Sequence, residues 1–159
     1  MPSPGALQLD GLEEAAPEIH AVSELGVRWL AETHRDVGAG CVAYGARFEE
    51  GSEHFLAYVF EWLKNEHRVH GELISFCALA MSFLQGNDPE RVVRLVRRTG
   101  VAAAPSHLGI SRELFRRMLL ELPGYAAREE LWPSVIETLE FTDELADRTF
   151  THIENATRL

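Results

Sequence analysis

The segment from Leu73 to Leu84 is apolar on nearly every side of any helix drawn through it. A helix of this kind offers no face to water and is buried on all sides. The segment is too short to cross a bilayer, because a spanning helix needs about 20 residues. We therefore predict a buried central helix that begins near His70, ends at Gly86 and is enclosed by the rest of the chain.

Helix signals recur on both sides of this segment. Ser52, Asp88 and Ser111 are residue types that cap helix N-termini. The pair Pro123-Gly124 predicts the end of the helix that Ser111 begins, and a last helix is expected at about residues 142–156. No run alternates apolar and polar residues as a half-buried strand does.

The N-terminal third has a weaker pattern. One apolar helix face is predicted from five residues at helical spacing: Ile19, Val22, Leu25, Trp29 and Leu30. The glycines in the segment 36–40 predict the end of that helix, and a short helix is expected at 42–48. Residues 1–11, with two prolines near the start, are predicted to form a flexible N-terminal arm.

These signals predict an all-α fold, a multi-helix bundle of about eight helices with short connections. The length of 159 residues suits one ordinary domain. We therefore expect a single helical domain over residues 12–159.

Composition disfavours several classes of protein. The net charge of -10 repels phosphate backbones, so we expect no nucleic-acid partner. Cys41 and Cys77 form no paired framework, and the N-terminus has no secretory signal, which predicts a cytoplasmic protein without a membrane segment. The arginines at 91, 94, 97 and 98 stand at helical spacing and predict a solvated helix face.

Two histidines stand in short motifs that suit a metal site, His54 in GSEH and His70 in HGE. They are 16 positions apart, so they meet only if the chain turns back between two helices. Imidazole binds Zn, Fe and Ni, but a catalytic site needs three protein ligands. The spacing alone leaves two interpretations open, an incomplete metal site and the commoner surface or capping histidines.

Residues 51–86 also resemble a known family. Their sequence, GSEHFLAYVFEWLKNEHRVHGELISFCALAMSFLQG, is similar to a segment of the iron-containing alcohol dehydrogenase superfamily, which includes glycerol dehydrogenase, glycerol-1-phosphate dehydrogenase and dehydroquinate synthase. The similarity continues through NDPERVVRLVRRTGVAAAPSHLGIS and covers about residues 20 to 125. The GSEH form is most similar to the glycerol-1-phosphate dehydrogenase branch.

The resemblance implies the C-terminal helical, metal-binding domain of the dehydroquinate synthase-like fold. His54 and His70 would be two ligands of a divalent metal, Zn, Fe or Ni. The metal would polarise an oxygen of a small-molecule polyol or phosphorylated polyol, and NAD(P) in a neighbouring domain would exchange hydride with the carbon.

The resemblance also implies roles for residues around the two histidines. Ser52 and Glu53 would orient His54, and Glu72 would support the site without binding the metal. His67 and Tyr58 are candidates for contacts with the substrate. No catalytic residue is assigned beyond these.

The sequence departs from the family in three ways. No Gly-rich turn follows a strand, so a nucleotide-binding domain is not expected within these residues. Asp10 and Asp36, the aspartates before His54, lack the Gly-Asp context of the family's third metal ligand. Tyr58 stands where many members have another polar residue, often histidine. We therefore expect a chain that is incomplete or inactive alone.

Three explanations fit such a chain: a piece of a longer enzyme, a partner of a separate nucleotide-binding subunit, or a relic that lost the reaction. A helical half without its partner domain would expose apolar surface, so a homo-oligomer, in the simplest case a dimer, is expected.

Two other classes of function stay open. The first is a non-catalytic helical interaction module, for which Val59, Trp62 and Trp132 are candidate surface residues, although core packing suits each of them better. The second is a haem protein of globin type, in which His70 and His107 would face the haem.

Overall fold

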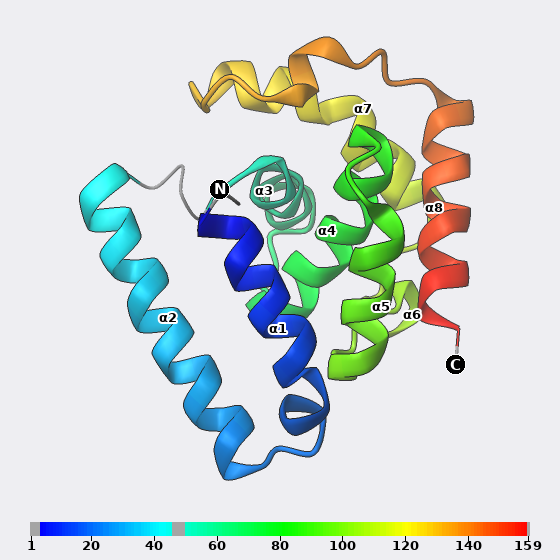
Figure 1. The fold of residues 1–159 in the computed structure, drawn as a ribbon. Coiled ribbons are helices and arrows are strands. Elements are labelled where there is room, and N and C mark those ends of the chain that lie inside the picture. Colours follow the sequence, from blue (N-terminus) through cyan, green and yellow to red (C-terminus); the bar gives the residue numbers. More distant parts are fainter. Residues whose placement is uncertain (1–3, 46–49, 159) are drawn as a thin grey trace.

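The computed structural model describes residues 4–45 and 50–158, and the regular structure in these ranges is helical throughout (Figure 1). The α-helices are, in order, α1 (Pro4–His20), α2 (Glu24–Tyr44), α3 (Ser52–Lys64), α4 (His70–Gln85), α5 (Pro89–Thr99), α6 (Pro105–Leu108), α7 (Arg112–Arg128) and α8 (Asp143–Thr157). A short 3-10 helix, η2 (Val135–Thr138), precedes α8. The predicted all-α multi-helix fold is confirmed.

Helix α4 lies at the centre of the bundle, as its sequence predicts. It packs against α3, α5 and α8, and its residues Leu73, Phe76 and Leu79 are almost completely buried. The helix begins at His70 and is closed by Gly86, whose φ of 61° is the left-handed conformation that glycine adopts without strain.

A row of phenylalanine rings joins α4 to the C-terminal helices. Phe76 on α4 meets Phe115 on α7 edge-on, with ring centroids 5.6 Å apart. Phe115 in turn lies 5.5 Å from Phe150 on α8. All three rings are buried, and α3 packs on both α4 and α7. This core fixes α3 and α4 against each other, and these two helices carry the candidate site.

The first two helices form a layer at one side of the bundle (Figure 1). Helix α1 packs on α5, and α2 packs on α1. Arg91 of α5 pairs with Asp10 and Glu13 of α1, and Arg94 also reaches Glu13. The prediction of a solvated arginine face is therefore wrong for Arg91, because that side chain joins two helices.

The start of the chain differs from the prediction. The segment 1–11, predicted as a flexible arm, is helical from Pro4 onward, since proline suits the first position of a helix. The single helix face predicted across residues 19–30 is wrong. The chain turns at Val22, where φ is 51°, and Ser23 begins α2 by accepting the N–H of Gly26.

Helix α2 also continues through the predicted break at 36–40 and ends at Tyr44. A glycine inside a helix costs only about 1 kcal/mol, so two glycines do not by themselves end a long helix. The helix predicted at 42–48 falls partly on residues 46–49, which lie outside the described ranges.

The C-terminal helices follow the prediction more closely. Ser111 caps α7 by accepting the N–H of Leu114, and Thr142 caps α8 in the same way. Helix α7, however, runs past Pro123 to Arg128. A proline inside a helix costs about 3 kcal/mol, and the packing of Tyr125 against the core stabilises the continuation.

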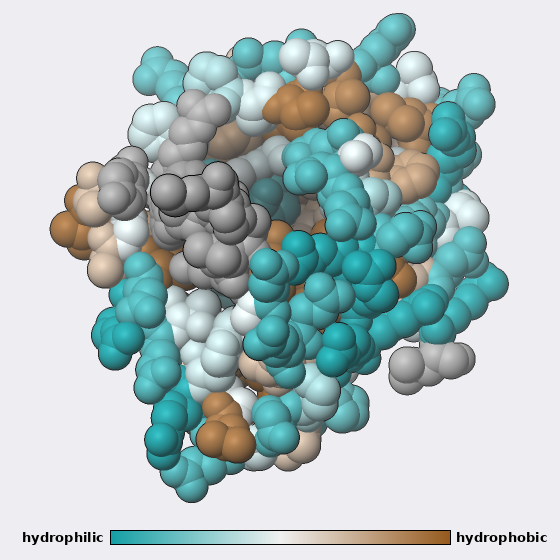
Figure 2. Space-filling model, in the orientation of Figure 1, coloured by the Kyte–Doolittle hydropathy of each residue, from teal (hydrophilic) through white to brown (hydrophobic). Residues whose placement is uncertain are grey.

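Hydrophilic side chains cover much of the face shown in Figure 2. An apolar area lies over α7 and the segment after it. Leu120 of α7 and Trp132, which follows α7, are each 49% exposed. Among the described residues, no helix has the length and apolar character that crossing a membrane requires.

Candidate metal centre

The structure brings His54 and His70 together. Their ring centroids are 5.4 Å apart and the rings are tilted by 45°. His54 lies in the first turn of α3 and His70 is the first residue of α4. The chain reverses between them because Asn65 takes a left-handed conformation, with φ 50°, and ends α3. Two imidazoles from two helices thus lie close together.

His54 is the more enclosed of the two histidines. It is 8% exposed, and its Nδ1 lies 3.1 Å from Oε1 of Glu53. The backbone N–H of Gly51 donates to the same carboxylate oxygen at 3.0 Å. Burial raises the pKa of Glu53, but the hydrogen bonds from His54 and the backbone outweigh it, so the pKa lies below its usual value.

A second contact fixes the start of α3. The Nε2 of Gln85, at the end of α4, donates to Oγ of Ser52 at 2.7 Å. Ser52 is buried, so this hydrogen bond is shielded from water. The residues that precede His54 are therefore held by the far end of the same helix that His70 begins.

Tyr58 lies one turn after His54, with ring centroids 6.3 Å apart. Burial, together with the hydrogen bond and negative charge of Glu50, raises the pKa of Tyr58 to about 12. The phenol therefore keeps its proton at neutral pH, and its O–H donates to the carboxylate of Glu50 next to the histidine pair.

His67 lies apart from the pair. Its side chain is 87% exposed, and its Nδ1 is 3.0 Å from Oε1 of Glu61. The contacts of the described residues do not join it to His54 or His70. His67 lies in the link between α3 and α4, and the path of this link, which the motifs do not indicate, determines where its side chain lies.

Sequence reasoning missed a link from α4 to α6. Oε2 of Glu72 lies 3.0 Å from Nε2 of His107. The two residues are 35 positions apart, so no local pattern signals the contact. Glu72 is therefore engaged with His107, the residue considered above as a haem ligand.

The two aspartates before His54 are engaged elsewhere. Asp10 pairs with Arg91, and Asp36 pairs with its neighbour Arg35. Within residues 4–45 and 50–158, no group of three or more His, Cys, Asp or Glu side chains is placed to hold a metal ion. The pair of imidazoles fits two of the three protein ligands of a catalytic site.

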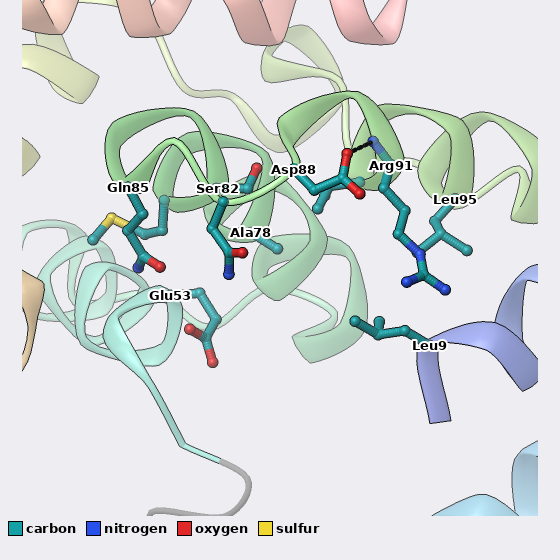
Figure 3. A pocket seen from close by; sticks show the side chains of 11 residues that line it. Leu9, Glu53, Ala78, Ser82, Gln85, Asp88, Arg91 and Leu95 are labelled. Atoms are coloured by element: carbon teal, nitrogen blue, oxygen red, sulfur yellow. Dashed lines mark hydrogen bonds between the residues drawn. The ribbon is translucent and has the colours of Figure 1, made fainter. Parts of the chain in front are cut away.

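A pocket of about 500 Å³ lies beside the start of α3 (Figure 3). Glu53 stands at one wall, and Gln85, Asp88 and Arg91 follow one another along another. Leu9 of α1 closes the remaining side. The carboxylate that contacts His54 therefore borders an open space as well as the histidine pair.

The sequence of the chain is similar to those of curated enzymes. Over 107 residues, 67% of this chain, the sequence is 32% identical to a protein of Hyperthermus butylicus named glycerol-1-phosphate dehydrogenase (NAD(P)+), of which the match covers 31%. The chain is a homologue of the glycerol-1-phosphate dehydrogenases. The resemblance carried by the GSEH and HGE motifs is thereby confirmed.

Other glycerol-1-phosphate dehydrogenases match in the same way. The protein of Sulfurisphaera tokodaii is 28% identical over 59% of this chain and 27% of its own length. That of Saccharolobus islandicus is 32% identical over 55% of this chain and 25% of its own. The chain thus spans about a third or less of the curated relatives it matches. No family model and no solved structure matches it.

Proposed function

We propose that this chain is the metal-binding helical half of an NAD(P)-dependent polyol or glycerol-phosphate dehydrogenase. The observation that carries the proposal is the 5.4 Å approach of His54 and His70 at the start of two packed helices. The homology to glycerol-1-phosphate dehydrogenases supports it, since that name specifies both the reaction class and the cofactor. A small polyol or phosphorylated polyol is the proposed substrate.

When bound, a divalent metal such as Zn, Fe or Ni would act as a Lewis acid on the substrate oxygen, and NAD(P) would exchange the hydride. His54 and His70 would each give one imidazole nitrogen to the metal. Tyr58, whose pKa of about 12 keeps the phenol protonated and whose hydroxyl is hydrogen-bonded to Glu50, would have to exchange Glu50 for a substrate oxygen in order to donate to the substrate. The burial of His54 would exclude water from one side of the site.

The remaining parts of such an enzyme would come from outside the described residues. A third metal ligand and a nucleotide-binding domain are needed, and the match covers only 31%, 27% and 25% of the three curated relatives named above. We propose that the rest of a longer protein or a separate subunit supplies them, in the cytoplasm, and that the assembly is a homo-oligomer. The chain alone would then bind metal without catalysing hydride transfer.

The metal content of the purified full chain tests this function. Elemental analysis after loading with Zn²⁺ should give about one equivalent for the wild type and a near-complete loss for the double variant His54→Ala plus His70→Ala. The control, His34→Ala plus His67→Ala, removes two exposed histidines and should keep the wild-type content. Equal content in the two double variants, or none in the wild type, would contradict the proposal.

The alternative function, a non-catalytic interaction module, has one structural observation in its favour. Trp62 and Trp132 are 45% and 49% exposed, which is unusual for large aromatic side chains, whereas Val59 is fully buried. Val59 therefore packs in the core. The haem reading has no such support, because His107 is engaged by Glu72.

A further inference from the structure

Glu53 and His54 are neighbours in sequence, and their side chains meet at 3.1 Å. Adjacent residues of a helix point about 100° apart, so the carboxylate has to bend back along α3 to reach the ring. The N–H of Gly51 holds it in that position by donating to the same oxygen, Oε1, at 3.0 Å. One carboxylate oxygen thus joins the helix terminus to the imidazole.

The carboxylate is held in place rather than mobile. The Glu53 side chain is only 26% exposed, and the residue before it is anchored by the hydrogen bond from Gln85 to Ser52. Figure 3 shows Glu53 lying below Gln85 at the wall of the pocket. Glu53 is therefore a fixed hydrogen-bond acceptor for Nδ1 of His54.

A fixed acceptor decides which nitrogen of the ring carries the hydrogen. A carboxylate at neutral pH only accepts hydrogen bonds, so the Nδ1 that faces it has to be the N–H. A neutral imidazole has one N–H, which leaves the lone pair on Nε2. Among the described residues, Nε2 of His54 has no hydrogen-bond partner, and the ring of His70 lies 5.4 Å from the His54 ring.

We propose that Glu53 is a positioning residue that holds His54 in the Nδ1–H tautomer and thereby makes Nε2 the metal-binding atom. The metal-binding part rests on the proposed function, whereas the tautomer does not. A carboxylate behind a ligand histidine fixes its orientation, and its loss costs about 10–100-fold in metal affinity. A carboxylate that only stabilises the start of α3 by its charge would leave the tautomer unchanged.

Nitrogen NMR of the metal-free full chain, at a pH where imidazoles are neutral, reads the tautomer directly. The wild type should show His54 with its hydrogen on Nδ1. In Glu53→Ala the Nε2–H form should appear, and Glu53→Gln, which offers both an acceptor and a donor, should give a mixture. Glu113→Gln is the matched control, because Glu113 has the same place in α7 as Glu53 has in α3, and it should not change the tautomer.

Zn²⁺ titration of the same proteins gives the second readout. Glu53→Gln should bind about 10–100-fold more weakly than the wild type, while Glu113→Gln stays within about threefold of it. An Nδ1–H tautomer that persists in both Glu53 variants would overturn the inference, as would an Nε2–H tautomer in the wild type. If the wild type binds no metal but the tautomer of His54 changes in the Glu53 variants as expected, the positioning role is supported and the proposed function is refuted.

Discussion

At the scale of single residues, His152 on α8 is a titratable side chain in an unfavourable place. Its ring stacks on Phe83 of α4, with centroids 4.6 Å apart, and its Nε2 is buried without a partner among the described residues. Burial lowers the pKa of His152, and the charge of Glu90 opposes this only in part. The neutral ring is therefore favoured in the folded chain.

We predict that the folded chain loses stability as the pH falls below about 6.5. The unfolded His152 takes up a proton near that pH, and the folded one does so only at lower pH, so acid favours the unfolded state. His152→Phe removes the titrating group and keeps a ring on Phe83. Urea denaturation at pH 7.5 and 5.5 should show a smaller loss of stability for this variant than for the wild type.

His34, which is exposed on α2, provides the control for this prediction. His34→Gln should lose as much stability on acidification as the wild type does. If His152→Phe behaves like His34→Gln, the burial of His152 is not the source of the acid sensitivity.

The row of buried phenylalanine rings leads to a second prediction, which concerns the free energy of unfolding. Phe76→Ala should lower the free energy of unfolding by about 3–5 kcal/mol, because Phe76 is fully buried against Phe115. Leu120→Ala, at a position that is 49% exposed, should change it by less than about 1 kcal/mol. Urea unfolding monitored by circular dichroism distinguishes the two variants, and similar losses would contradict the placement of α4 at the centre.

The sequence predicted the residues that local motifs mark and missed those that packing brings together. GSEH and HGE singled out His54 and His70, and the structure places their rings 5.4 Å apart. The surroundings of His152 depend on how α8 meets α4. Its partner Phe83 is distant in sequence, so no pattern within α8 could indicate it.

At the scale of elements, α1 and α2 form a hairpin whose backbones come very close. A Cβ added at Gly26 of α2 would meet the backbone oxygen of Glu18 in α1. A Cβ added at Gly38 of the same helix would meet nothing within 4 Å. The two glycines therefore provide a matched pair of sites for testing the hairpin.

We predict opposite effects of alanine at these two sites. Gly26→Ala should destabilise the chain by more than about 1 kcal/mol, because the backbones of α1 and α2 would have to separate. Gly38→Ala should stabilise it by about 0.5–1 kcal/mol, since alanine loses less conformational entropy in a helix. Thermal denaturation of both variants checks this, and a Gly26→Ala protein as stable as the wild type would refute the close approach.

Helices with strong terminal signals were the ones predicted well. Asp88 caps α5 by accepting the N–H of Arg91, and Gly86 closes α4, as their residue types indicate. The predicted ends at 36–40 and at Pro123 were wrong because glycine and proline only add a cost to a helix. Packing against α1 and against the core outweighs that cost.

At the scale of the whole molecule, the all-α architecture follows from the absence of strand patterns, but the arrangement of the helices does not. The N-terminal layer is placed by ion pairs between α1 and α5 that lie 81 positions apart in sequence. The two histidines of the candidate site come from α3 and α4, which the core holds together. The chain thus keeps two histidines in place while spanning about a third of a related dehydrogenase.

X-ray absorption spectroscopy of the Zn²⁺-loaded full chain shows whether His54 and His70 bind one metal ion together. We predict two imidazole nitrogens at about 2.0–2.1 Å from the metal in the wild type. Each single variant, His54→Ala and His70→Ala, should show one imidazole. A spectrum with oxygen ligands alone, or an imidazole count that neither substitution changes, would contradict this prediction.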